Sequence, residues 1–433
     1  MTFLLLGLLV AELALMVAWG LWKRERTIQF PFLTAVGFAG YLLPQLFALT
    51  HDASLPNGAL DKTIVMSMLC LAAAHWGYVC NRKPAQLFQH WEYHHHRLVI
   101  GSVATSAVGA YFFYQVSQLQ AEVSLEHGTQ WTGIITIYAF FAQLLTVGFI
   151  IALTLLLKRP SWTTALIVLF GLVLYFDRIV FHGRRGSMVE LFLAVVLSLW
   201  FQFRWAPPRW SVLAGVAGAT LMVNAIVVYR QTMLERDHTT WTGAGLSEVL
   251  AIDYWGIFSQ SFTDGGTDMR NALYLIEGVD QSISFDYGLW LWDALVRRFV
   301  PGQIIGHDTK EAMQFNFTAD HFQRFAYTPR TGTTMTGIAD SFSAFWYFGA
   351  VKFLVIGFII SRFYKAAEEG NLGAQLFVVL TGYSAMQIFT FSTHSFVLGA
   401  VDFLLFVVPV MYFARRGRES QSRRLRPRAS TLH

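Results

Sequence analysis

The sequence has little charge and little cysteine for its length. Only 14% of its 433 residues are Asp, Glu, Lys or Arg, against about 25% in a soluble domain, while 55% are hydrophobic. The two cysteines, Cys70 and Cys80, fall in one apolar run, which offers neither a disulfide framework nor a thiolate metal cluster. Walker, dinucleotide-binding and nucleophile-elbow motifs are also missing. These absences argue against an ordinary soluble enzyme and indicate an integral membrane protein.

The net charge of +5 comes from the end of the chain. Residues 415–428 hold seven arginines and one glutamate, a net charge of +6, which leaves −1 for the rest of the chain. A basic face that would bind nucleic acid is therefore not expected.

Eleven apolar runs are long enough to cross the roughly 30 Å hydrocarbon core of a bilayer as helices. They lie near 2–22, 30–50, 63–80, 98–117, 132–157, 161–181, 188–203, 210–229, 335–360, 373–393 and 396–414. The seventh has only 16 residues, which leaves a tilted or re-entrant segment as its alternative. The predicted fold class is an all-α polytopic membrane protein with about eleven transmembrane helices.

Basic residues are concentrated in alternate connections between these runs. They occur at 23–26, 81–97, 158–160, 204–209, 362–371 and in the tail. Because short cytoplasmic loops are rich in Lys and Arg, we expect the N-terminus outside and the C-terminus inside. The first run is followed, not preceded, by its basic cluster and is expected to be an uncleaved anchor. On this topology, 182–187 and the long connection 230–334 lie outside.

Four parts follow along the chain. Residues 1–229 hold transmembrane helices 1–8, 230–334 an extracytoplasmic loop domain, 335–414 helices 9–11, and 415–433 a basic cytoplasmic tail. The loop is too long and too aromatic for a linker, so we expect it to be folded and mostly helical. One of its helices, ending at Pro301, has an apolar face formed by Trp292, Leu295, Val296 and Phe299. Such a helix is expected to lie along the outer membrane interface.

Arginines are found at the predicted outer ends of the helices. They are Arg184, Arg185, Arg230, Arg297 and Arg298. The guanidinium group is always charged and binds phosphate oxygens through a planar fork, which suits a lipid-linked pyrophosphate. The alternative is contact with lipid phosphates without a dedicated site.

Candidate acids and bases lie in the loop and at the start of the ninth span. They are His307, Asp308, Asp320, His321 and Asp340. Asp340 lies in a stretch that is polar for a membrane segment, which indicates that it faces a cavity. A general base must reach a hydroxyl at about 3 Å. The alternative for each residue is a structural hydrogen bond or a solvated carboxylate.

Two further groups carry weaker signals. The histidines His90, His94, His95 and His96 suggest a metal site, but Glu92 stands at the wrong offset for a zinc-binding helix motif. A polar interfacial segment is favoured, and no metal or other cofactor is expected. Asp52, a single acid in an early outer loop, matches only loosely the acid that lipid-phosphosugar glycosyltransferases of the GT-C type carry there.

Five short elements stand out within an architecture of about a dozen spans with one large outer loop in the second half. They are Gly183-Arg184-Arg185-Gly186-Ser187, Tyr229-Arg230, Arg298-Phe299-Val300-Pro301, the stretch 331–341 that ends in Asp340-Ser341, and Tyr347-Phe348-Gly349. In these elements and in the whole architecture the chain resembles the oligosaccharide repeat-unit polymerases, the Wzy-type O-antigen and exopolysaccharide polymerases. Asp340 stands where the family usually has Glu, and Gly302 where it would have Arg.

The resemblance implies a GT-C-like fold and a metal-independent glycosyltransferase in the bacterial cytoplasmic (inner) membrane, with its active site facing the periplasm. A growing glycan on polyprenyl pyrophosphate would be the donor, and a lipid-linked repeat unit the acceptor. Arg184, Arg185, Arg230, Arg297 and Arg298 would neutralise the pyrophosphate. Asp340, His321 or Asp320 would serve as the base. Membrane lipids, a chain-length regulator and a flippase would be its other partners.

Two alternatives remain open. An O-antigen ligase shares the architecture and donor but transfers the glycan to lipid A core. A lipid-linked oligosaccharide transporter or flippase would have paired inverted repeats and charges deep in several spans. The charges within the apolar runs lie near predicted ends or stand alone: Asp177, Arg178, Glu190, Lys352 and Asp402. This distribution favours an enzyme that works at the outer interface.

Overall fold

The apolar runs form helices because a helix satisfies the backbone donors and acceptors of a segment internally, as a bilayer requires. The computed structural model describes residues 1–81, 83–126, 134–180, 184–234, 252–260, 262, 266–317, 319–330 and 333–416. Within these ranges the chain is helical without a β-strand, and one isolated bridge joins Tyr93 to Arg415.

The helices form three groups along the chain. The first group consists of α1 (Thr2–Trp22), the 3₁₀ helix η1 (Arg24–Ile28), α2 (Phe30–Leu49), α3 (Ala59–Cys80), α4 (His95–Glu126), α5 (Ile134–Ala142), α6 (Leu144–Lys158), α7 (Trp162–Val180), α8 (Arg185–Phe203) and α9 (Arg209–Leu234). The second group lies within the predicted loop domain 230–334, which we call the insert. It consists of α11 (Tyr254–Gln260), α12 (Thr267–Ser282), α13 (Leu289–Phe299), α14 (Gly302–Ile305), α15 (His307–Ala312) and α16 (Ala319–Gln323). The last group consists of α17 (Thr336–Phe345), the 3₁₀ helix η2 (Trp346–Ala350), α18 (Val351–Glu368), α19 (Leu372–Thr390), α20 (His394–Asp402), the π-helix η3 (Phe403–Val407) and α21 (Val408–Ala414).

Ten segments are long and apolar enough to cross a membrane within the part of the chain that the structure describes. One is the 18-residue stretch Gly186–Phe203 of α8, so the short seventh run is a full-length candidate. The predicted span 210–229 lies in α9, which has 26 residues and whose side chains beyond 221 are outside the described residues. The predicted class, an all-α polytopic membrane protein, is confirmed. The side of the membrane on which each end lies remains a prediction.

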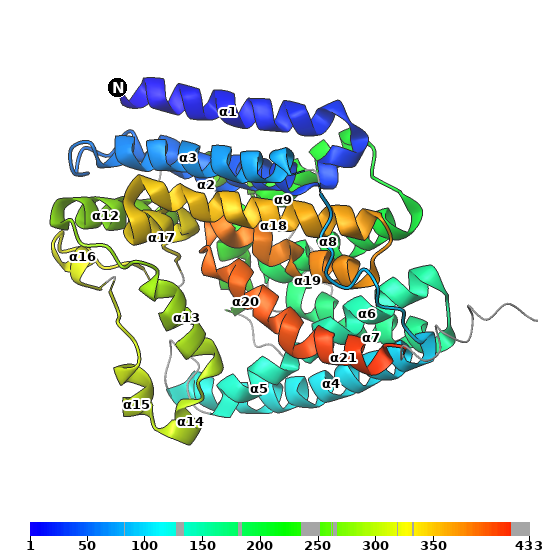
Figure 1. Ribbon diagram of the computed structural model, residues 1–433. Coiled ribbons are helices and arrows are strands. Elements are labelled where there is room, and N and C mark those ends of the chain that lie inside the picture. The colour runs from blue at the N-terminus through cyan, green and yellow to red at the C-terminus, as the bar shows by residue number, and fades with distance from the viewer. Residues whose placement is uncertain are drawn as a thin grey trace, which may run out of the picture.

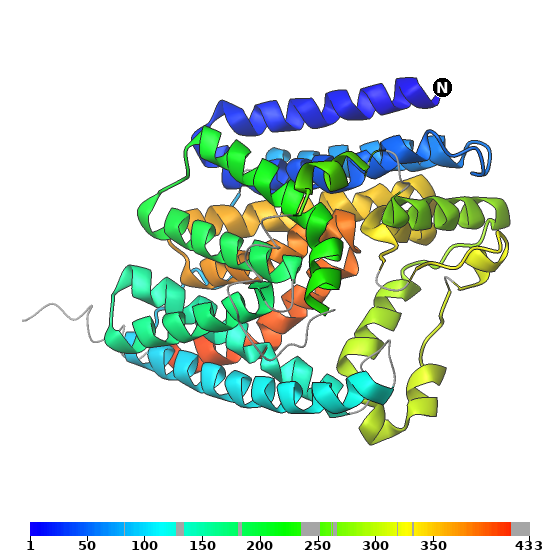
Figure 2. The same ribbon diagram turned by 180° about the vertical axis from the view of Figure 1, so that it is seen from behind.

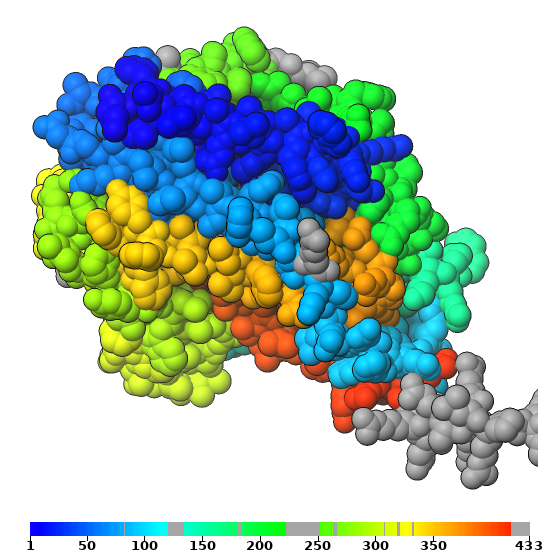
Figure 3. Space-filling model, turned by 45° about the horizontal axis from the view of Figure 1, so that its top comes forward, coloured from blue at the N-terminus to red at the C-terminus, as the bar shows by residue number. Residues whose placement is uncertain are grey.

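The two chain ends mark opposite ends of the bundle (Figure 1). We call the end with the N-terminus and α12 the insert end, and the end with residues 415 and 416 the tail end. Figure 2, seen from behind, shows α8 and α9 (green) on the face turned toward the viewer, which is the back of Figure 1. On the outside, α1 covers α3 (Figure 3) and exposes Phe3, Leu15 and Trp22 by 72–76%. Large exposed apolar surfaces of this kind fit contact with lipid.

The centre of the bundle is packed with phenylalanine rings. Phe389 of α19 lies 4.6 Å from Phe353 of α18 and 6.1 Å from Phe38 of α2, measured between ring centroids. All three side chains are at most 1% exposed. These contacts join the first and last groups of helices into one core.

The predicted span 335–360 is not a single helix. Its first part, α17, has 10 residues, about 15 Å, which is half of the hydrocarbon core. The chain then turns back at η2, so that Gly349 lies against the backbone of Ser341 and the Lys352 ammonium reaches Asp340. In an uninterrupted helix Lys352 and Asp340 would be about 18 Å apart. The turn therefore places polar groups of α17 next to the start of α18.

Gly349 makes this turn possible because a side chain there would have no room. A Cβ at Gly349 would lie 1.7 Å from the Ser341 carbonyl oxygen, whereas one at Gly7 of α1 would have nothing within 4 Å. We expect Gly349→Ala to cost about 1–3 kcal/mol or more, as overpacking does, and Gly7→Ala to be neutral or slightly stabilising. Thermal unfolding of both variants in detergent measures this. Equal melting temperatures for the two variants would contradict the close packing of Gly349 against Ser341.

Candidate functional site

A second break in a helix lies beside the turn of η2. The predicted spans 373–393 and 396–414 are α19 and the α20–α21 segment, and between them 391–393 leave the helical conformation. The backbone N–H groups of Phe391 and Ser392 both donate to the Gln387 carbonyl, at 2.8 and 3.3 Å. Free polar groups at such a break are tolerated in a membrane only where protein or water satisfies them.

The Asp340 carboxylate accepts hydrogen bonds from the polar groups at this break. It accepts hydrogen bonds from the Thr393 N–H at 2.6 Å, the Thr393 hydroxyl at 2.8 Å and the Ser392 hydroxyl at 2.9 Å. The Lys352 ammonium adds an ion pair at 3.0 Å. Asp340 is only 2% exposed. Its oxygens are therefore occupied by protein donors, and the carboxylate holds the two broken helices together.

The contact between Ser392 and His394 extends this network toward the surface. The Ser392 hydroxyl bonds both to the Asp340 carboxylate and to Nδ1 of the His394 ring. A carboxylate has no proton to give, so the single hydroxyl proton of Ser392 is directed at Asp340. Nδ1 of His394 must then carry a proton and donate it to Ser392, which leaves the lone pair on Nε2. This arrangement prepares a neutral imidazole that can accept a proton.

His394 lies under α13 of the insert. Its ring centroid is 6.2 Å from Trp290 and 6.0 Å from Phe391. Arg297 follows Trp290 by two turns of α13 and is exposed, and its Nε donates to the Asp293 carbonyl at 3.3 Å. The imidazole thus lies next to the indole ring of a helix that also carries a cation. We call Asp340, Lys352, Ser392, Thr393 and His394 the Asp340 cluster.

Helix α12 fixes the segment that leads into α17. Asp268 accepts hydrogen bonds from the Tyr41 hydroxyl and from the Thr334 N–H, the latter at 2.6 Å. Asn271 donates to the Thr334 carbonyl at 2.9 Å. Lys62 of α3 bonds Glu277 at 2.8 Å. These ties hold the insert against α2 and α3 and position α17.

Asp286 connects the insert to the other side of α17. It accepts from the Gly288 N–H at 2.8 Å and from the Ser343 hydroxyl at 3.1 Å. Burial raises the pKa of Asp286, and the hydrogen bond from Gly288 acts against this rise. Its contacts make it a support for α17.

Arg298 anchors the far end of α13 to the membrane helices. Its guanidinium forms an ion pair with Asp402 of α20 at 2.5 Å and donates to the Gln143 side chain at 2.6 Å. Gln143 lies between α5 and α6, the two helices into which the predicted span 132–157 is divided. Asp402 and Lys352 stand alone in their apolar runs in the sequence. In the fold, Asp402 pairs with Arg298 and Lys352 pairs with Asp340. Arg298 therefore contacts protein groups on both sides, and its predicted role toward a pyrophosphate remains a prediction.

The predicted apolar face of α13 is only partly correct. Val296 is buried, and Phe299 packs on Phe140 at 5.7 Å. Trp292 is 46% exposed, and its indole N–H donates to the Met313 carbonyl. Asp293, which is not part of the predicted apolar face, is also buried, and its carboxylate accepts the N–H groups of Phe315 and Asn316. The helix thus packs against its own loop as well as against the bundle.

The other predicted arginines lie at helix ends. The exposed Arg184 precedes α8, and its N–H donates to the Arg178 carbonyl at 3.0 Å. Arg185 begins α8 and Arg230 lies in α9, but both side chains are outside the described residues.

Gly186 connects this region to the Asp340 cluster. A Cβ at Gly186 would lie 2.1 Å from the Tyr383 hydroxyl, and Tyr383 accepts from the Gln387 side chain at 2.7 Å. Gln387 in turn holds Ser392 through its carbonyl. The motif around Arg184 and the motif around Asp340 therefore meet at the same end of α19.

Among the residues whose side chains the structure describes, the contacts of the remaining predicted bases do not include Asp340. His321 is 3% exposed and packs against Phe317 at 4.7 Å and against Gly278 of α12. Asp320, in α16, and His307, at the start of α15, have side chains outside the described residues. Asp308 lies in the first turn of α15. His321 has the contacts of a buried packing residue.

Asp52 has a partner in the insert. It forms an ion pair with Arg270 of α12 at 2.6 Å, and the side chain and N–H of Ser54 bond it as well. The hydrogen bonds of Ser54, followed by the charge of Arg270, lower the pKa of Asp52. This acid serves to dock α12 on the loop after α2.

The structure adds Lys352, Ser392 and His394 to the residues expected from sequence. A signal for them exists in the polar run Ser392-Thr393-His394-Ser395 between two apolar spans. No cluster of three or more His, Cys, Asp or Glu side chains that could hold a metal occurs in the described ranges. The chemistry that the described cluster offers is proton transfer by an imidazole.

The fold and the candidate spans define a multi-pass, all-α membrane protein. Comparisons with protein-family models, curated proteins and solved structures find no match to this chain. Its function is therefore inferred from the site itself.

Proposed function

We propose that this protein polymerises polyprenyl-pyrophosphate-linked oligosaccharide repeat units into O-antigen or exopolysaccharide at the outer leaflet of the bacterial cytoplasmic membrane. The observation that carries the proposal is the chain of hydrogen bonds from Asp340 through Ser392 to His394, set at two broken helices beneath α13. Broken helices with satisfied polar groups are typical of sites within membrane proteins.

In the proposed reaction the His394 Nε2 accepts the proton of the acceptor hydroxyl. A bond forms between that oxygen and the anomeric carbon of the donor, and the bond from this carbon to the pyrophosphate breaks. Asp340 positions Ser392 and His394 and does not itself contact the acceptor.

Charge neutralisation comes from arginines. The exposed Arg297 lies on α13, two turns after the Trp290 that contacts His394, and Arg184 precedes the start of α8, where Gly186 packs on Tyr383 of α19. With Arg185 and Arg230 they would offset the charge that develops on the leaving pyrophosphate. Arg298 would contribute indirectly, by fixing α13 to Asp402. Trp290 offers an aromatic face for a sugar ring beside His394.

The test is a reconstitution of the purified protein in liposomes with a synthetic polyprenyl-pyrophosphate repeat unit. A ladder of lipid-linked polymer is expected, and Arg185→Ala, Arg230→Ala and Arg297→Gln should reduce it by tenfold or more, as loss of a transition-state charge contact does. Arg324→Gln, another exposed arginine of the insert, is the matched control. Transfer to added lipid A core in the place of a ladder would favour the ligase, and movement of the lipid without new glycosidic bonds would favour a flippase.

A further inference from the structure

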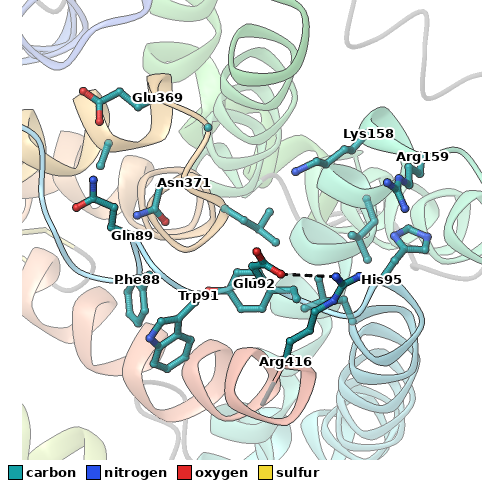
Figure 4. A pocket seen from close by; sticks show the side chains of 16 residues that line it. Phe88, Gln89, Trp91, Glu92, His95, Lys158, Arg159, Glu369, Asn371 and Arg416 are labelled. Atoms are coloured by element: carbon teal, nitrogen blue, oxygen red, sulfur yellow. Dashed lines mark ion pairs between the residues drawn. The ribbon is translucent and has the colours of Figure 1, made fainter. Parts of the chain in front are cut away.

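A pocket of about 550 Å³ lies at the tail end, across the bundle from the Asp340 cluster (Figure 4). Its size is within the range of about 300–1,000 Å³ for small-molecule sites. Its walls are the connection before α4, the end of α6, the turn between α18 and α19, and Arg416. Nothing in the proposed reaction uses it.

The walls of the pocket are held by hydrogen bonds between segments far apart in sequence. The Asn371 side chain donates to the Leu87 carbonyl at 2.9 Å. The His94 N–H donates to the Ala414 carbonyl and the Arg416 N–H to the Glu92 carbonyl, both at 2.8 Å. The guanidinium of Arg415 lies 4.7 Å from the Trp91 ring centroid. The cavity is therefore formed before any ligand arrives.

Positive charge predominates along one side of the pocket. Lys158 is the last residue of α6 and Arg159 follows it, and both line the pocket together with His95. No carboxylate lies within ion-pair distance of either cation among the residues that the structure describes. Glu92 is paired with Arg416 at 3.6 Å, and Glu369 lies across the pocket from Lys158 (Figure 4).

Two long helices begin at the pocket as well. His95 and Leu98 belong to the first turn of α4, and Leu372 is the first residue of α19. The first N–H groups of a helix have no partner within the helix and carry a partial positive charge. Asn371 caps one of these groups on α19, that of Ala374. The two helix starts add donors to a cavity that already holds uncompensated cations.

We propose that this pocket binds a phosphate group, with Lys158 and Arg159 as its charged contacts. Phosphate oxygens accept several charge-assisted hydrogen bonds at once, which matches cations and amide donors converging on one cavity. The aromatic and aliphatic walls formed by Phe88, Leu98 and Leu155 suit the apolar part of a phosphate-bearing molecule. The phosphate can belong to a lipid headgroup or to a soluble ion, and both sources share this chemistry. On the predicted topology the pocket faces the cytoplasm.

The test is a calorimetric titration of the full chain in nanodiscs of zwitterionic lipid, with inorganic phosphate in one arm and short-chain phosphatidic acid in the other. Saturable binding is expected, and Lys158→Gln combined with Arg159→Gln should weaken it by more than about tenfold. Lys23→Gln combined with Lys83→Gln removes two exposed lysines outside the lining and should leave it within about twofold. Binding of phosphatidic acid alone assigns a lipid headgroup, and equal binding of both probes assigns a soluble phosphate.

Removal of Glu92 gives a test that does not depend on a loss of function. Glu92→Gln frees Arg416 from its ion pair and removes a negative charge from the lining, so binding should tighten by about twofold to fivefold. The proposal is overturned if neither probe binds the unaltered protein, if the pocket and control variants lose affinity equally, or if Glu92→Gln weakens binding.

Discussion

Replacement of His394 by Asn is expected to lower the rate of glycosyl transfer by about 10²–10⁴-fold, the range for loss of a general base. Asn carries an amide N–H near the place of Nδ1, so it can still donate to Ser392, but it has no group equivalent to the basic Nε2. The fold should therefore be kept while the proton acceptor is lost. The initial rate of polymer formation in liposomes, measured from pH 5 to pH 9, checks this expectation.

Two companion variants separate catalysis from packing. Ser392→Ala should lower kcat less than His394→Asn does and displace the pH profile, because the imidazole loses the partner that fixes its tautomer. His321→Asn is the matched histidine control: it should reduce stability but not the rate per folded molecule, since His321 is buried against Phe317 and α12. A full rate in His394→Asn at every pH would remove His394 from the mechanism.

The membrane helices could be predicted from sequence because burial in lipid depends on local composition. The runs near 2–22 and 30–50 match α1 and α2 to within one residue. The same property hides the breaks. The residues of η2, 346–350, include no charged side chain, so the turn looks like part of a continuous span. What reverses the chain there is a contact between Gly349 and Ser341, which no local average can report.

The candidate site was accessible to sequence reasoning only in part. Asp340 attracts notice because a carboxylate in an apolar run is costly and needs a partner. Its partners come from outside its own helix: Lys352 follows the turn, and Ser392 lies 52 positions along the chain. Arg298 resembles a phosphate ligand in sequence, but Asp402, 104 positions away, neutralises it. Pairing over such separations is a property of the fold, and so the sequence shows the charges but not their partners.

Replacement of Lys352 by Met is expected to destabilise the protein by about 3–5 kcal/mol, the usual cost of removing one member of a buried ion pair. The Asp340 side chain is 3% exposed and that of Lys352 26%. Without the ammonium, the carboxylate must either stay charged without a counter-charge or take up a proton and lose hydrogen bonds from Thr393 and Ser392. Unfolding by denaturant in mixed micelles, followed by tryptophan fluorescence, measures the change.

The control and the rescue decide whether the charge itself is responsible. Arg204→Met removes a cation that is itself 52% exposed from a pair with Glu368 at 3.5 Å, and it should cost no more than about 1 kcal/mol. Asp340→Asn in the Lys352→Met background removes the unpaired charge and should recover part of the lost stability. If Lys352→Met costs no more than Arg204→Met, the charge of Lys352 does not help to hold the two broken helices. The hydrogen bonds of Ser392 and Thr393 would then be sufficient to hold the Asp340 carboxylate, and through Ser392 they would still order the His394 ring.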